Sequence, residues 1–140
     1  MNKDRAVLIV EDSDHESTLV TSAIALADPA LEVRTVADLQ AANIYLTDGA
    51  STAKHWLIIL GSRALRELKQ AIKVHGNADV VVVGVGDEVQ PSTRQRALQM
   101  GVLAVEDRPS TWKEYRALVD SIIRARLPKP DGAPGMPLRS

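Results

Sequence analysis

Three short, uninterrupted apolar runs constrain the fold of this chain most strongly. They occupy residues 6–10, 56–60 and 80–83, and the last consists of four consecutive valines. Each run is too short to span a membrane. None alternates polar and apolar residues, as a strand with one solvated face would. Such runs are typical of strands buried on both faces, which indicates a parallel sheet covered by helices.

Amphipathic segments with helix-end signals lie between these runs. Ser13 and Glu16 have the spacing of a capping box, Asp38 is a favoured N-cap, and Pro91 is a favoured first helical residue. Either Ser110 or Thr111 caps the last helix. We therefore expect helices over residues 14–27, 39–47, 62–75, 91–100 and 112–127. The expected strands cover residues 6–10, 31–36, 56–60, 80–83 and 103–105.

Five alternations of strand and helix predict an α/β fold. Because crossovers between parallel strands are right-handed, the leading choice is a flavodoxin-like (βα)5 doubly wound parallel sheet with strand order 2-1-3-4-5. We expect residues 1–127 to form this single domain. Residues 128–140 contain four prolines and two glycines, and this composition predicts a disordered tail.

The composition of the chain limits the kinds of molecule that we expect it to bind. The chain has 140 residues, no cysteine and a formal net charge of −1. These values exclude disulfides and give no reason to expect nucleic acid or an anionic membrane as a partner. No segment has the pattern of a signal peptide or a membrane span. A cytoplasmic location is the expectation.

In a doubly wound fold the functional residues lie at the carboxyl ends of the strands. Glu11 and Asp12 follow the first predicted strand, Gly61 the third and Gly84 the fourth, and Arg108 lies just beyond the fifth. Two adjacent carboxylates are suitable ligands for a hard cation such as Mg²⁺. The simpler interpretation, which spacing alone favours, is that they cap the next helix and meet the positive end of its dipole. Spacing alone does not exclude the cation site.

Several of these segments resemble response-regulator receiver domains. Residues 7–12, Val-Leu-Ile-Val-Glu-Asp, resemble the first strand and acidic pair of that family. Residues 10–15 are especially similar to single-domain receivers associated with phytochrome-type histidine kinases. Residues 80–88 resemble the fourth strand and its loop, and residues 101–109 resemble the segment around the fifth strand. The resemblance covers about residues 5–127 and implies the receiver fold.

The chain departs from the family at the residues that carry phosphorylation. The resemblance places Gly61 at the phosphoacceptor aspartate, Gly84 at the switch serine or threonine, and Arg108 at the lysine that pairs with the phosphoryl group. A degenerate acidic pocket of Glu11, Asp12 and Arg108 remains. We expect no cofactor and at most weak binding of Mg²⁺ by Glu11 and Asp12, with Arg108 reaching the two carboxylates and partly neutralising them.

These departures favour a pseudo-receiver that acts as a phosphorylation-independent interaction module in two-component signalling. One alternative is a receiver phosphorylated at a non-standard residue, and another is a small flavodoxin-like ligand-binding protein. The sequence offers no phosphate-binding glycine loop, no nucleophile–base pair and no metal cluster, so we do not expect an enzyme. The expected partner is a histidine kinase or another two-component signalling protein.

The last predicted helix has a wide apolar stripe that suggests an interface. Two of the four aromatic residues, Trp112 and Tyr115, lie in its first turn, and Val119 and Ile123 extend the stripe. Aromatic side chains are efficient interface anchors. The resemblance to receiver domains implies that a homodimer or a bound partner uses the face formed by the fourth helix, fifth strand and fifth helix, and we expect this stripe to contribute to it. The alternative is that these residues complete the core.

Overall fold

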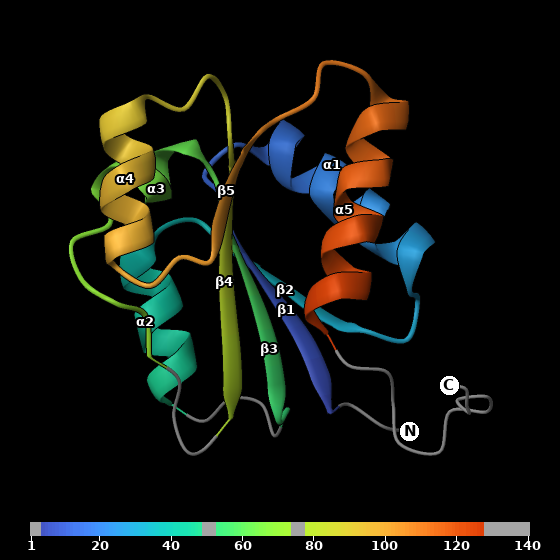
Figure 1. Ribbon diagram of the computed structural model, residues 1–140. Helices are drawn as coiled ribbons and strands as arrows, with labels where there is room; N and C mark the ends of the chain where they lie inside the picture. Colours follow the sequence, from blue (N-terminus) through green and yellow to red (C-terminus); the bar gives the residue numbers. More distant parts are fainter. Residues whose placement is uncertain (1–3, 49–52, 74–77, 128–140) are drawn as a thin grey trace, which may run out of the picture.

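The computed structural model describes residues 4–48, 53–73 and 78–127. Strands and helices alternate along the whole described chain (Figure 1). The strands are β1 (Arg5–Val10), β2 (Glu32–Val36), β3 (His55–Leu60), β4 (Asp79–Gly86) and β5 (Ala104–Asp107). The helices are α1 (Asp14–Ala27), α2 (Leu39–Thr47), α3 (Ser62–Glu67), α4 (Pro91–Gln99) and α5 (Trp112–Arg126).

The five strands form one parallel sheet in the order β2-β1-β3-β4-β5. The predicted fold class and strand order are therefore confirmed. β1 lies between β2 and β3, and the last residue of β1, Val10, is in register with Leu60 of β3. This register brings the residues that follow β1 and β3 together at one edge of the sheet.

Helices cover both faces of the sheet and divide the core into two layers. Figure 1 shows α1 and α5 on one side and α2, α3 and α4 on the other. Alternate residues of β1 point into the two layers. Val7 and Ile9 pack in the layer with α1 and α5, and Leu8 packs in the layer with α2, α3 and α4. Strands of this kind have no solvated face, which explains the uninterrupted apolar runs in the sequence.

All five predicted helix starts are confirmed, and three of the helices have a side-chain N-cap. Ser13 caps α1 by accepting a hydrogen bond from the backbone N–H of Glu16 at 3.2 Å. Asp38 caps α2 in the same way, and Thr111, one of the two predicted candidates, caps α5. These caps fix where the chain leaves the functional edge of the sheet and enters each helix.

Three element boundaries differ from the prediction by two residues or more. The helix predicted to run from residue 62 to residue 75 ends at Glu67, because the buried side chain of Leu68 packs into the core from an extended backbone. Tertiary packing here overrides good local helix propensity. β4 continues through Gly84 to Gly86, which were predicted as loop, because this part pairs with β5. β5 correspondingly ends later, at Asp107.

The predicted disordered tail, residues 128–140, lies outside the described residues. Within the described ranges, no helix is both long enough and apolar enough to cross a membrane.

Candidate functional site

The acidic pair, Glu11 and Asp12, lies at the carboxyl end of β1 as predicted. The backbone N–H of Glu11 bonds to the carbonyl of Val36 at 2.9 Å, which holds this turn against β2. The Glu11 carboxylate accepts a hydrogen bond from the backbone N–H of Ser13 at 3.0 Å. Partial burial raises the pKa of Glu11 above its usual range, and the neighbouring Asp12 carboxylate adds to the increase.

Gly61, the predicted acceptor position, lies directly beside this pair. Its backbone N–H bonds to the carbonyl of Val10 at 2.9 Å. A Cβ atom built on Gly61 would lie 2.9 Å from Cδ of Glu11 and closer still to one carboxylate oxygen. The carboxyl group of Glu11 therefore fills the space that a side chain at position 61 would enter.

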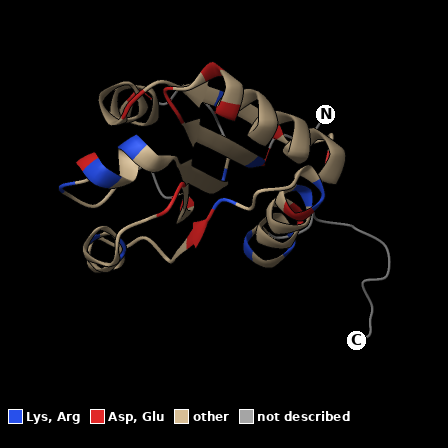
Figure 2. Cartoon of the chain, turned by 90° about the horizontal axis from the view of Figure 1, so that it is seen from above, with Lys and Arg blue, Asp and Glu red and all other residues tan. Residues whose placement is uncertain are grey.

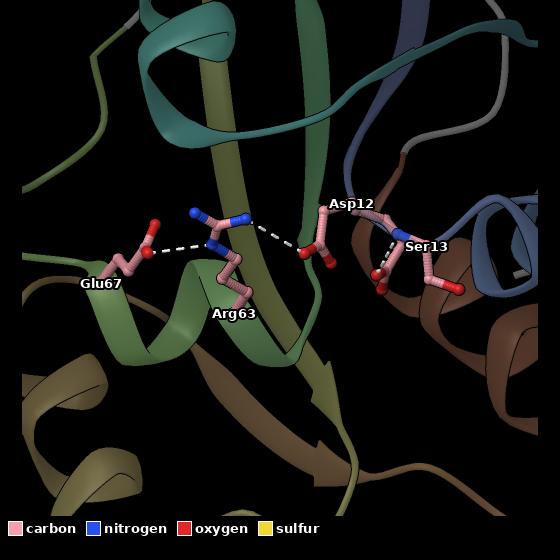
Figure 3. A network of polar contacts seen from close by, with 5 residues as sticks. Asp12, Ser13, Arg63 and Glu67 are labelled. Atoms are coloured by element: carbon pink, nitrogen blue, oxygen red, sulfur yellow. Dashed lines mark hydrogen bonds and ion pairs between the residues drawn. The ribbon is translucent and has the colours of Figure 1, made fainter.

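Arg63 is the positively charged residue that contacts the acidic pair, through Asp12. It stands in the first turn of α3, two residues after Gly61, and its Nη1 lies 3.3 Å from Oδ2 of Asp12. Its Nε lies 3.0 Å from Oε2 of Glu67, so the guanidinium bridges two carboxylates (Figure 3). The hydrogen bond from Arg63 lowers the pKa of Asp12 below its usual range.

Arg108 does not reach the acidic pair, so that expectation is wrong. Its guanidinium lies 3.0 Å from Oε1 of Glu16 in α1 and 3.5 Å from Oδ2 of Asp87 in the loop before α4. Arg108 follows β5 directly, and its backbone N–H bonds to the carbonyl of Gly86 at 2.7 Å. This strand-end position directs its side chain toward the start of α1. Figure 2 looks onto this edge of the molecule and shows acidic and basic segments side by side there.

Gly84, the predicted switch position, faces a different neighbour from Gly61. A Cβ atom built on Gly84 would lie 2.6 Å from Cδ2 of Leu65, a buried residue of α3. The same leucine side chain would also lie close to a Cβ on Gly86. Leu65 therefore occupies the space in front of β4 that larger residues at these two positions would require.

The loop between β4 and α4 is attached to the rest of the edge by side chains. Ser62 accepts a hydrogen bond from the backbone N–H of Asp87 at 2.8 Å. Asp107 accepts one from the backbone N–H of Val89 at 3.0 Å. Between them, Glu88 has a positive φ of 48°, which is uncommon for a residue with a side chain. These contacts fix one backbone path for the loop.

The charged side chains at the carboxyl ends of the strands form a charged edge, and the sequence did not indicate that Arg63 and Glu16 belong to it. For Arg63 a usable signal was present, since α3 begins immediately after β3 and its first turn must lie beside the end of β1. The contact between Glu16 and Arg108 depends on a loop path that residue spacing does not reveal.

Three of the four predicted interface residues belong to the core. Tyr115 is 3% exposed, and Val119 and Ile123 are also buried, because α5 packs this side against α1 and the sheet. Their assignment to an exposed interface is wrong for this chain. Trp112 is 41% exposed and lines a groove of about 510 Å³ between α1 and α5, together with Leu26. Trp112 therefore faces α1 rather than α4.

The described carboxylates of the charged edge already have partners within the chain. Within residues 4–48, 53–73 and 78–127, no group of three or more His, Cys, Asp or Glu side chains is arranged to hold a metal ion. The carboxylate of Glu11 is turned onto Gly61, and Asp12 is paired with Arg63. A cation such as Mg²⁺, which requires a nearly octahedral set of oxygen ligands, would compete with these contacts.

No protein-family model matches the chain, and no curated protein matches it significantly. Solved structures do match. The phosphorylated cyanobacterial phytochrome response regulator RcpA is 18% identical, with a TM-score of 0.68, over 90% of this chain and 95% of that one. The response regulator RPA3017 in red light signalling of R. palustris is 20% identical, with a TM-score of 0.63, over 86% and 92%.

The response regulator Rcp1, in its Mn²⁺-bound form, is 20% identical, with a TM-score of 0.63, over 84% of this chain and 91% of that one. The similarity to these structures extends over most of the described sheet and helices, and it agrees with the strand order found here. The chain has the fold of response-regulator receiver domains.

Proposed function

We propose that this protein is a pseudo-receiver, a protein-interaction module of two-component signalling that works without phosphorylation. The receiver fold supports a role in two-component signalling, since the similar structures are response regulators. Fold alone does not determine activity, so the proposal depends on the residues at the carboxyl edge of the sheet.

The proposal rests on one observation: the space for a phosphoacceptor side chain at position 61 is filled by another residue of the chain. Gly61 has no side chain to accept a phosphoryl group, and Glu11 occupies the space in front of it. Glu11 is partly buried and hydrogen-bonded to the backbone of Ser13. The edge is thus filled by the chain's own side chains.

Contacts elsewhere at the carboxyl edge of the sheet favour a single conformation of this edge. Arg108 links the start of α1 to the loop before α4 through Glu16 and Asp87. Asp107 and Ser62 bond to the backbone of the same loop. A receiver without a phosphate-driven equilibrium presents one surface to its partners at all times, because no ligand shifts its conformation.

The surface proposed for partner binding is the side of α4 and β5. Leu98 at the end of α4 is 46% exposed, and Leu103 just before β5 is 51% exposed. Exposed leucines on α4 and beside the edge strand β5 offer apolar area for contact with a second protein. A second copy of the chain, binding through this α4–β5 surface, forms the proposed homodimer. A histidine kinase or another two-component protein is the proposed heterologous partner.

Amide NMR spectra test the fixed state. The protein is titrated with Mg²⁺ and beryllofluoride, which mimics a phosphoryl group on a carboxylate. The proposal predicts no shifts for residues of the loop between β4 and α4 or for Leu98 and Leu103. Saturable shifts that spread from the carboxyl edge to α4 would show a working switch and would contradict the proposal.

A further inference from the structure

We propose that Arg63 supplies the positive charge that the acidic pair would otherwise take from a divalent cation, so that this edge is independent of metal. The inference rests on the proposed function and deepens it, since it explains how the edge remains stable with neither phosphate nor metal. It concerns the charge balance of Glu11 and Asp12, not the partner surface.

Two adjacent carboxylates lie at the end of a buried strand, and their charges repel each other. Glu11 is partly buried and needs hydrogen-bond donors from the protein, whereas Asp12 is exposed and gains from a counter-ion by reducing this repulsion. Glu11 receives the backbone N–H of Ser13 at 3.0 Å. Asp12 receives the guanidinium of Arg63 at 3.3 Å. Both members of the pair are therefore compensated by groups of this chain.

The position of Arg63 follows from the fold. α3 begins at Ser62, directly after the turn at Gly61, so its first turn lies beside the end of β1. Glu67, one helical turn further along, contacts Nε of Arg63 and leaves Nη1 for Asp12 (Figure 3). A planar guanidinium can address two carboxylates with separate N–H groups, which a compact ammonium does less well.

Arg108, the other arginine at this edge, is already paired with other carboxylates. The two ion pairs of Arg108 are with Glu16 and Asp87, and neither involves the acidic pair. A divalent cation at the acidic pair would have to displace Arg63 from Asp12. It would also have to turn Glu11 away from Gly61, where no side chain provides a third oxygen ligand.

Titration with Mn²⁺, followed by the electron paramagnetic resonance signal of the free ion, tests the inference. The wild type and Arg63→Gln, Arg63→Lys and Arg116→Gln variants are compared. Arg63→Gln removes the charge, Arg63→Lys retains it, and Arg116→Gln removes an exposed charge from α5 as the matched control. We expect Arg63→Gln to bind Mn²⁺ about fivefold more tightly than the wild type, as expected for the loss of one exposed ion pair.

Arg63→Lys should bind Mn²⁺ less tightly than Arg63→Gln, because it retains the positive charge, and the α5 control should bind it no better than the wild type. Equal Mn²⁺ affinity in Arg63→Gln and the wild type would overturn the inference. Tight, saturable binding to the wild type would also overturn it, since Arg63 would then not exclude the metal. Neither result bears on phosphorylation, which is measured separately by mass, so failure of this inference is distinguishable from failure of the proposed function. Circular dichroism establishes that each variant is folded.

Discussion

The carboxyl group of Glu11 occupies the space in front of Gly61. Its Cδ would lie 2.9 Å from a Cβ atom at position 61, and the nearer carboxylate oxygen would be closer. The two residues are brought together because β1 and β3 are neighbouring parallel strands that end in register. A side chain introduced at position 61 must therefore displace the end of Glu11, so the two positions are energetically coupled.

Restoring an acidic residue at this position should make stability depend on metal. In Gly61→Asp, three carboxylates share one edge, and their repulsion should lower the free energy of unfolding by roughly 1–3 kcal/mol in the absence of metal. Mg²⁺ should recover part of this loss, because it supplies the missing positive charge. Urea denaturation with Mg²⁺ and with a chelator measures the difference.

Gly84→Ala is the matched control for this experiment. Its Cβ would press on Leu65, and overpacking of this kind costs roughly 1–3 kcal/mol. The loss should be the same with Mg²⁺ and with chelator, since no carboxylate is added. If Gly61→Asp were likewise indifferent to Mg²⁺, the coupling between positions 61 and 11 would not create a cation site.

The ion pair between Arg108 and Glu16 should contribute measurably to stability. Both side chains are largely shielded from solvent, with exposed fractions of 27% and 19%. A double-mutant cycle with Arg108→Gln and Glu16→Gln should give a coupling energy of about 0.5–1 kcal/mol that falls as salt is added. The corresponding cycle between Arg108 and Asp12 should give a value near zero. A larger coupling to Asp12 than to Glu16 would contradict the arrangement of the edge.

Tyr115 should make the protein less stable in alkali. Burial raises the pKa of its phenol above the value in the unfolded chain. The resulting stability is fully present below about pH 10, where the phenol is neutral in both states. This stability is lost as the pH rises further, because the phenol of Tyr115 then ionises more readily in the unfolded chain, and the equilibrium shifts toward unfolding. Urea midpoints measured between about pH 8 and 11 should fall less steeply for Tyr115→Phe than for the wild type.

Tyr45→Phe is the comparison variant: burial also raises the pKa of that phenol, but the residue as a whole is only half-buried, so this change should flatten the alkaline loss less than Tyr115→Phe does. An absorbance titration in which Tyr115 ionises near pH 10 in the folded protein would show that it is not part of the core.

The α4–β5 surface should determine the oligomeric state. Replacing Leu98 and Leu103 by Ser should lower the mass measured by light scattering if the wild type is a dimer, with little change in circular dichroism because both side chains are exposed. Leu26→Ser, at the groove between α1 and α5, is the control and should leave the mass unchanged. Dissociation by Leu26→Ser alone would place the interface at α1 and α5 instead.

The layout of the fold was predictable because its signals are local. Apolar runs mark the doubly buried strands, and caps at Ser13 and Asp38 mark the helix starts. The end of α3 was not predictable, since the segment around Leu68 has good helix propensity and its extended path depends on packing against distant residues. Long-range packing of this kind leaves no periodic signal in the sequence.

The candidate site was predictable in part. Glu11, Asp12 and Gly61 were placed together because strand order alone brings their positions to one edge. The partners of Arg63 and Arg108 were not foreseen, because long side chains can reach several carboxylates and the loop geometry selects among them. Tyr115 was misassigned for a related reason: a wide apolar stripe does not show which of its residues face α1.

Intact-mass measurement after incubation with acetyl phosphate and Mg²⁺ is the decisive experiment on phosphorylation. A receiver with an acidic phosphoacceptor, treated in parallel, shows that the phosphodonor is active. Since Gly61 has no side chain and Glu11 is held in front of it, we predict that the mass of the wild type stays unchanged. A stoichiometric phosphoryl adduct that hydroxylamine removes would reveal an acyl phosphate and would contradict the claim that this receiver fold works without phosphorylation.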